Sequence, residues 1–207
     1  MNKSKVLKEA FEWVEMIVIS ISIVLIVMSV FVRHSPVVGR SMYPTLKGSA
    51  VDAYDTCAAE PGQNDVLLIS NFMYTPKSGD IIVTQANGHM ENPLVKRVIA
   101  VGGQSLRIDF NNWQVYVDGE LLEEDYVASK EGVMYGETDF NIHMKNSCEI
   151  DEDGAYIIPE GYVFCMGDNR NQSKDSRVAA VGIIDERLIV GKVLFRVYPF
   201  DRIGVVK

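Results

Sequence analysis

The chain has 207 residues, of which 47% are hydrophobic, and a formal net charge of −8. This length supports one well-packed core and at most a small second lobe, and the hydrophobic content excludes a disordered chain. The charge is uneven, because residues 118–153 hold 12 acidic and 2 basic residues while the rest is close to neutral. Such a segment argues against nucleic acid or an anionic lipid head group as its partner, and a solvated acidic surface explains it most simply.

The cysteines and histidines form no metal or disulfide pattern. Cys57, Cys148 and Cys165 show no metal-ligand spacing, and an odd number in a chain of this length does not suggest a disulfide scaffold. The sequence leaves open whether Cys57 and Cys148 pair, and Cys165 is expected in the core. The scattered histidines receive no role: His34, His89 and His143. We therefore predict no metal site.

The N-terminal region predicts a membrane anchor. Residues 1–12 form a polar flank with lysines and glutamates, and the 17 residues 16–32 carry no charge. As a helix they span about 25 Å against a bilayer core of roughly 30 Å, and Trp13 and Val14 extend the segment. A cleaved signal peptide and a buried core helix are the alternatives, but the run is longer than a usual signal-peptide core and no clear cleavage site follows. The flanking positive charges are balanced and do not decide the orientation.

A serine follows the anchor in the segment GRSMYPTL, residues 39–46. Pro44 fixes its own φ and biases Tyr43 away from helical conformations, so we expect Ser41 on an extended segment or in a tight turn. A lone serine is more often a solvated or capping residue. Here two later segments could supply its partners.

Beyond residue 46 the chain predicts β structure. Short apolar runs bounded by turns indicate strands at residues 66–69, 81–85, 94–101, 104–109, 113–117, 155–158, 162–166 and 188–198. Asp118 and Gly119 predict a hairpin turn, and a weak signal marks a helix start near Asp185. The expected fold is mainly β: a single N-terminal transmembrane helix, then an antiparallel β domain with a smaller β/loop insertion.

One of these strands carries a lysine that could act as a base. A serine hydroxyl needs a base to attack a carbonyl, and burial lowers a lysine pKa because the charged form loses hydration. Lys96 and Arg97 lie on opposite faces of the strand 94–101, so one of them must face inward or lie at an edge. Arginine cannot plausibly release its proton, which makes Lys96 the candidate. By spacing alone, a lysine that extends to solvent is the simpler interpretation.

The polar segment at residues 167–177 follows the predicted strand at residues 162–166. It begins with glycine, aspartate and asparagine, which favour a tight turn. Asp175 and Arg177 could pair and make the loop rigid. Ser173 or Ser176 could hydrogen-bond a lysine amine and orient it. Alone, this segment would be an ordinary polar loop.

Three of these motifs, in this order, resemble the boxes of bacterial type I signal peptidases. SMYPTL at residues 41–46 is similar to their nucleophile box. KRVI at residues 96–99, followed by two glycines, resembles their general-base box. GDNR at residues 167–170, followed by Ser173 and by DSR at residues 175–177, is similar to their last box. The resemblance runs from about residue 14 to about residue 200.

The resemblance implies a membrane-bound Ser/Lys endopeptidase that removes signal peptides from exported pre-proteins without a cofactor. Ser41 is then the nucleophile, Lys96 the general base and Ser173 the residue that orients the Lys96 amine. Four residues would support the site: Asp168, Arg170, Asp175 and Arg177. Four others would line the pockets for the small residues one and three positions before the cut: Val37, Met42, Leu94 and Val95.

The resemblance also implies how the chain is placed at the plasma membrane. Residues 1–12 would be cytoplasmic, residues 13–32 would be the transmembrane anchor, and the rest would lie outside. The β catalytic core is expected at residues 33–106 and 155–207, and an acidic insertion lobe at residues 107–154. The expected partners are pre-proteins and the lipid bilayer, and no nucleic acid.

Gly39 departs from part of the family pattern. Some members have a serine two positions before the nucleophile, whose hydroxyl helps to stabilise the oxyanion, so Gly39 leaves the second oxyanion donor open. We expect Gly39→Ser to keep or raise activity if the backbone tolerates a side chain. Two other functions compete: a Ser/Lys peptidase of the self-cleaving repressor or pilin-processing type, and a membrane-tethered β domain that binds partners without chemistry.

Overall fold

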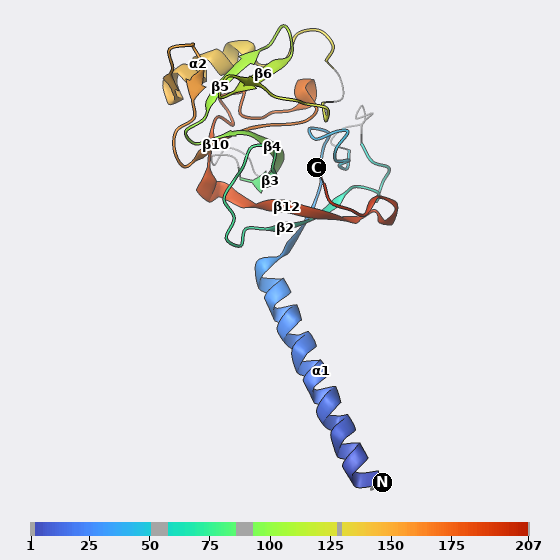
Figure 1. The fold of residues 1–207 in the computed structure, drawn as a ribbon. Coiled ribbons are helices and arrows are strands. Elements are labelled where there is room, and N and C mark those ends of the chain that lie inside the picture. The colour runs from blue at the N-terminus through green and yellow to red at the C-terminus, as the bar shows by residue number, and fades with distance from the viewer. Residues whose placement is uncertain (1–2, 51–57, 86–92, 128–129, 207) are drawn as a thin grey trace. The chain divides into compact units, whose positions relative to one another are not determined.

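The computed structural model describes residues 3–50, 58–85, 93–127 and 130–206. The chain divides into two units, Met1–Arg33 and His34–Lys207. The first is the helix α1 (Lys3–Phe31), shown in blue in Figure 1. Its serines Ser20, Ser22 and Ser29 donate their hydroxyls to carbonyls three or four residues earlier, which satisfies these polar groups within the helix. By length and hydropathy, no helix among the described residues qualifies as a membrane span.

The larger unit is built on two antiparallel sheets. The first has seven strands in the order β1-β2-β12-β3-β4-β10-β11. Its strands are β1 (Arg33–Pro36), β2 (Val66–Ser70), β3 (Ile81–Thr84), β4 (Leu94–Val101), β10 (Tyr162–Met166), β11 (Ile184–Asp185) and β12 (Ile189–Tyr198). Figure 1 shows the long red strand β12 running beside β2. The sheet places β4 between β3 and β10, so both of its edges are hydrogen-bonded.

The second sheet has five strands in the order β7-β6-β5-β9-β8. They are β5 (Ser105–Asp109), β6 (Gln114–Val117), β7 (Glu120–Leu121), β8 (Glu149–Ile150) and β9 (Tyr156–Ile157). All eight predicted strands are present within one or two residues, and the antiparallel fold is confirmed. The hairpin turn at Asp118 and Gly119 is also confirmed, since both have a positive φ between β6 and β7.

The prediction of a loop-rich insertion was incomplete, because the segment contains the helix α2 (Glu137–Ser147). This helix buries Phe140, His143 and Met144, which lie three and four residues apart on one face. The weak helix signal near Asp185 corresponds to a single 3-10 turn, η2 (Glu186–Leu188), capped by the Asp185 side chain. The other 3-10 turns are η1 (Arg170–Gln172) and η3 (Phe200–Arg202).

Aromatic packing joins the two sheets. The ring of Phe140 lies 5.3 to 5.7 Å from the rings of Phe110, Tyr156 and Phe164, which come from the second sheet region and from β10. All four belong to one buried cluster. Aromatic pairs at this distance add to the free energy of burial, so α2 and the second sheet are packed onto the strand that leads into the third motif.

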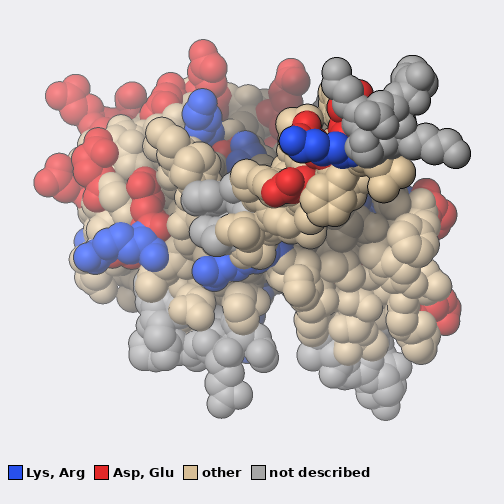
Figure 2. Space-filling view, turned by 90° about the horizontal axis from the view of Figure 1, so that it is seen from below, with Lys and Arg blue, Asp and Glu red and all other residues tan. Residues whose placement is uncertain are grey.

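The expected positions of the cysteines and of the acidic residues are largely confirmed. Cys165 is buried in the core, and the half-buried Cys148 forms no disulfide with any residue that the structure describes. Cys57 and His89 lie outside the described residues. Figure 2 shows acidic side chains, in red, gathered along one side of the face seen there. Of the 12 acidic residues in 118–153, only Glu124 is buried.

Candidate active site

Ser41 lies in a tight turn between the first unit and β2. Tyr43 N–H donates to the Arg40 carbonyl at 3.1 Å, and Leu46 N–H donates to the Met42 carbonyl at 2.9 Å. Met42 and Leu46 are buried in one apolar cluster, so the turn is held by its own apolar side chains. The predicted turn is confirmed.

Lys96 meets this turn from the middle of the first sheet. Its Nζ lies 2.8 Å from Ser41 Oγ and 2.9 Å from the Val95 carbonyl oxygen. The residue is only 2% exposed, so the alternative of a lysine that extends to solvent is excluded. Arg97, on the opposite face of β4, is buried as well.

The surroundings of Lys96 favour a neutral amine. Burial lowers the pKa of Lys96 from an ordinary value of 10.5 to about 8, because the charged form cannot be hydrated there. The carboxylates of Asp175 and Asp168 and the Cys165 thiol act in the opposite direction but do not overcome burial. A useful fraction of Lys96 is therefore unprotonated near neutral pH, as a general base requires.

The loop after β10 packs directly against the serine turn. Asn169 N–H donates to the Ser41 carbonyl at 3.0 Å, and the Asn169 amide donates to the Arg40 carbonyl at 3.1 Å. Gly167 lies so close that an added Cβ would be 2.4 Å from the Ser41 carbonyl oxygen. A side chain at this position is excluded, and glycine permits the close approach of the two backbones.

Two buried ion pairs hold this loop. Arg177 Nε donates to Asp175 Oδ1 at 2.8 Å, so the predicted pair is present, and Asp175 Oδ2 accepts the Gly167 N–H at 2.9 Å. Burial alone would raise the pKa of Asp175, but the Arg177 guanidinium keeps it below its usual value. Asp168 pairs with Arg97 through both carboxylate oxygens, at 2.9 and 2.8 Å. The sequence did not indicate Arg97 as this partner.

The third buried ion pair lies between Arg170 and Glu124 of the acidic segment. Arg170 donates through both terminal nitrogens to the Glu124 carboxylate, with 3.0 Å between Nη1 and Oε2. Sequence reasoning missed Glu124, because nothing in the sequence separates it from its acidic neighbours. Ser173 is buried beside Gly167, and its Oγ forms no hydrogen bond of ordinary geometry within the described residues.

The chain is similar to known proteins over most of its length. A family model described as "Signal peptidase, peptidase S26" matches residues 10–198. Signal peptidase IB of Staphylococcus aureus is 32% identical over 94% of this chain and 92% of its own length. A probable signal peptidase I-1 of Synechocystis is 35% identical over 69% of this chain and 66% of its own. A crystal structure of a signal peptidase I from Enterococcus faecalis V583 covers 58% of this chain and 97% of its own, at 23% identity and a TM-score of 0.41.

The chain belongs to the signal peptidase family, peptidase S26. It is a serine peptidase of the signal peptidase I type, which cleaves signal peptides. Of the three functions considered from the sequence, the comparisons support the first and not a binding module without chemistry.

The residues expected to form the substrate pockets of this peptidase separate into two groups. Val37, Met42 and Val95 pack in one cluster beside the serine turn. Leu94 packs in a different cluster. Neighbouring residues of a strand point to opposite faces, which explains why Leu94 and Val95 separate.

The structure changes the expectation for Gly39. Its φ is +79°, a conformation that costs a residue with a side chain roughly 1–2 kcal/mol. Gly48 also packs against it, since a Cβ on Gly48 would lie 2.2 Å from the Gly39 carbonyl oxygen. A side chain at Gly39 would therefore have to adopt a strained backbone conformation, a cost that the expectation from the sequence left out.

We now expect Gly39→Ser and Gly39→Ala to lower the thermal midpoint and the turnover alike, because both must adopt the strained φ. The measurement is the thermal midpoint and kcat of the two variants side by side. Full turnover in Gly39→Ser together with loss in Gly39→Ala would instead show that the serine hydroxyl supplies an oxyanion donor, against this expectation.

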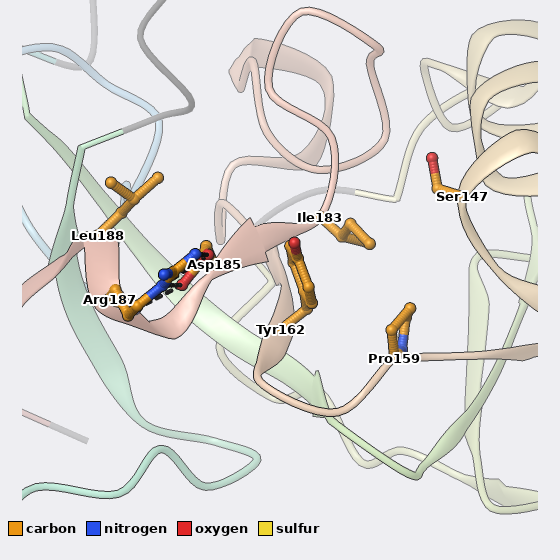
Figure 3. A pocket seen from close by; sticks show the side chains of 7 residues that line it. All are labelled: Ser147, Pro159, Tyr162, Ile183, Asp185, Arg187 and Leu188. Atoms are coloured by element: carbon orange, nitrogen blue, oxygen red, sulfur yellow. Dashed lines mark hydrogen bonds and ion pairs between the residues drawn. The ribbon is translucent and has the colours of Figure 1, made fainter.

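A surface hollow of about 680 Å³ offers no competing serine site. It is lined by Ser147, Pro159, Tyr162, Ile183, Asp185, Arg187 and Leu188 (Figure 3). Ser147 is the serine of this hollow, and Figure 3 shows it apart from Asp185, whose carboxylate faces Arg187. Hydrogen bonds from Arg187 lower the pKa of Asp185 to about 2, which makes it a weak base. The Ser41–Lys96 pair, whose side chains are 2.8 Å apart, is therefore the stronger candidate site.

Proposed function

We propose that Ser41 is the nucleophile and Lys96 the general base of signal-peptide cleavage. The observation that carries this proposal is the 2.8 Å distance between Ser41 Oγ and the Nζ of a lysine that is almost completely buried. A base within this distance can take the serine proton directly. Neither neighbouring charge nor a metal is needed to explain the activation of Ser41.

The reaction then follows the chemistry of acyl transfer. Neutral Lys96 takes the Ser41 proton as Oγ bonds to the carbonyl carbon of the scissile peptide, and the ammonium returns that proton to the leaving amine as the C–N bond breaks. Lys96 next takes a proton from water, whose oxygen bonds to the acyl carbon. The ester C–O bond then breaks, the ammonium returns this proton to Ser41 Oγ, and the signal peptide leaves as a carboxylic acid that ionises in solution. The backbone N–H of Ser41 can donate to the oxyanion, and backbone or water supplies the second donor.

We propose supporting roles for the residues around the pair. Asp175 and Arg177 hold the loop that carries Gly167, and Asp168 and Arg170 fix its first part through their ion pairs with Arg97 and Glu124. Ser173 orients the neutral Lys96 amine by accepting a hydrogen bond from it, which leaves the lone pair of the amine for the Ser41 proton. The pockets for small residues before the cut are lined by Val37, Met42 and Val95 beside the serine turn and by Leu94 on the opposite face of β4.

We also propose that residues 13–32 anchor the enzyme in the plasma membrane, with residues 1–12 cytoplasmic and the β domain outside. The support is the membership of the family and the absence of charge in residues 16–32, because hydropathy and length do not by themselves qualify α1 as a span. The β core at 33–106 and 155–207 and the acidic lobe at 107–154 are the working domain boundaries.

The orientation predicts which part of the chain an added protease can reach. In intact spheroplasts the β domain should be digested and a tag before residue 13 should survive. Protection of the β domain until the membrane is broken would reverse the proposed orientation. A cytoplasmic marker protein that stays intact is the control for membrane integrity.

The test of the function uses the detergent-solubilised full chain and a secretory pre-protein. N-terminal sequencing should place the cut after a small residue, and Ser41→Ala should give no product. The alanine variant removes one oxygen from a half-buried turn, so its circular dichroism and thermal midpoint should match the wild type. Cleavage by a folded Ser41→Ala variant would remove Ser41 from the mechanism.

A further inference from the structure

The buried carboxylate of the acidic segment lies in residues 124–126, which we call the strap. Its neighbours Glu123 and Asp125 are exposed, whereas Glu124 is buried. A carboxylate is rarely buried unless it is paired. The residue that pairs with Glu124 therefore indicates which part of the structure the strap holds.

Glu124 holds an arginine of the loop beside the active site. Its side chain and that of Arg170 are 2% and 1% exposed, and both guanidinium ends contact the carboxylate. The remaining donor, Arg170 Nε, donates to the Gly167 carbonyl at 3.2 Å. Gly167 is the residue that packs against the Ser41 carbonyl, so one contact chain joins Glu124 to the nucleophile.

Tyr126 holds a second arginine next to the base. The guanidinium of Arg97 lies 3.9 Å above the centre of the Tyr126 ring, a distance typical of a cation–π contact. Arg97 follows Lys96 directly in β4 and binds Asp168 with two hydrogen bonds. The Tyr126 hydroxyl donates to Glu124 Oε1 at 3.2 Å, which ties the two ends of the strap together.

Stabilisation of the fold alone does not explain well why the strap contacts two buried arginines. Replacing a buried ion pair by apolar residues of similar volume is often neutral or stabilising. A planar guanidinium with two partners, however, fixes geometry more strictly than an apolar contact does. The two arginines meet the loop at consecutive residues, Gly167 and Asp168, directly beside Ser41.

We propose that the strap positions the active-site loop, and that Glu124 is a positioning residue for the Ser41–Lys96 pair, acting through Arg170 and Gly167. This inference rests on the proposed roles of Ser41 and Lys96. It gives the acidic insertion a function in the reaction, because the lobe contributes the buried Glu124 carboxylate and the Tyr126 ring to the surroundings of the Ser41–Lys96 pair.

The experiment compares Glu124→Gln with Glu123→Gln in the full-length enzyme. Glutamine keeps the shape of Glu124 and removes the charge that holds Arg170, whereas Glu123 is exposed and serves as the matched control. We expect kcat of Glu124→Gln to fall on the order of 10- to 100-fold, because a small misplacement of reacting groups has this effect. KM should stay within about twofold, and the control should match the wild type.

The pH profile provides a readout that a purely structural role would not change. A displaced loop lets water reach Lys96, so the midpoint of the rise in kcat/KM with pH should move from about 8 toward the ordinary lysine value of 10.5. If Glu124→Gln does not fold, Glu124→Leu combined with Arg170→Leu removes both buried charges. That double variant should fold and should still have the low kcat, because Gly167 loses its Arg170 contact.

The inference is overturned if Glu124→Gln, or the double variant in its place, keeps the wild-type kcat, or if the pH midpoint does not move. Ser41→Ala, measured in parallel, separates this failure from failure of the proposed function. An inactive Ser41→Ala beside a fully active Glu124→Gln rejects only the strap. Cleavage by Ser41→Ala rejects the proposed nucleophile itself.

Discussion

Lys96→Arg and Lys96→Met are both expected to abolish signal-peptide cleavage, with a loss of at least ~10²–10⁴-fold in kcat/KM, the usual contribution of a general base. Arginine keeps the positive charge but does not release its proton at any accessible pH. Methionine fills a similar volume and has no proton acceptor of use. Lys96→His could retain a trace of activity, because imidazole accepts a proton but is shorter than lysine.

The methionine variant should also be more stable than the wild type at neutral pH. The pKa of Lys96 is lower in the folded chain than in the unfolded chain, so the folded state binds fewer protons between about pH 8 and 10.5 and its stability rises with pH there. Below this window the buried charge costs on the order of 3 kcal/mol, which Lys96→Met removes. The prediction is tested by comparing the thermal midpoints of Lys96→Met and the wild type at neutral pH.

An inactive Lys96→Met with a midpoint equal to or above the wild type assigns the loss to chemistry and not to unfolding. Substantial activity in Lys96→Arg would remove lysine from the mechanism. A large fall in the midpoint of Lys96→Met would contradict the view that burial of this amine is unfavourable to folding.

Gly167→Ala should have the next largest effect. The new Cβ would lie 2.4 Å from the Ser41 carbonyl oxygen and 2.3 Å from Ser173 Oγ. A backbone atom has less freedom to move than the end of a flexible side chain, so either the serine turn or the loop of Gly167 must shift and the Ser41–Lys96 geometry changes. Overpacking of this kind typically costs about 1–3 kcal/mol of stability, and a displacement near 1 Å can cost ~10²-fold in kcat.

The matched control is Gly204→Ala. A Cβ at Gly204 would meet no atom within 4 Å, and Gly204 is not among the glycines with a positive φ. This variant should keep the wild-type kcat and thermal midpoint. Wild-type kcat in Gly167→Ala would show that the close approach of this loop does not set the geometry of the pair.

Much of the fold follows from local signals in the sequence. The strands are short apolar runs between turn residues, and Pro44 predicts the turn that carries Ser41, so these elements depend on neighbours in the chain. The pairing of Ser41 with Lys96 could be inferred from motif order, because the family resemblance supplied the spatial link. Their distance and the burial of Lys96 came only from the structure.

The missed features depend on contacts far apart in the sequence. Helix α2 is rich in polar residues and begins after Gly136, which forms no side-chain cap, so its signal is limited to a short apolar face. Arg97 meets Asp168 across 71 positions, and Arg170 meets Glu124 across 46. Local sequence patterns do not indicate which of many charged residues will form an ion pair. The partners are determined by the tertiary packing of the folded chain.

The pH dependence of kcat/KM for the wild-type enzyme tests the central claim most directly, because it reports the base of the free enzyme. Measured from about pH 6 to pH 10 with a pre-protein substrate, the rate should rise with pH through a midpoint of about 8, as Lys96 loses its proton. The rate should then level off, because the amine is fully neutral. A rate that is constant over this range, or that already levels off near pH 6, would contradict a mechanism in which neutral Lys96 activates Ser41.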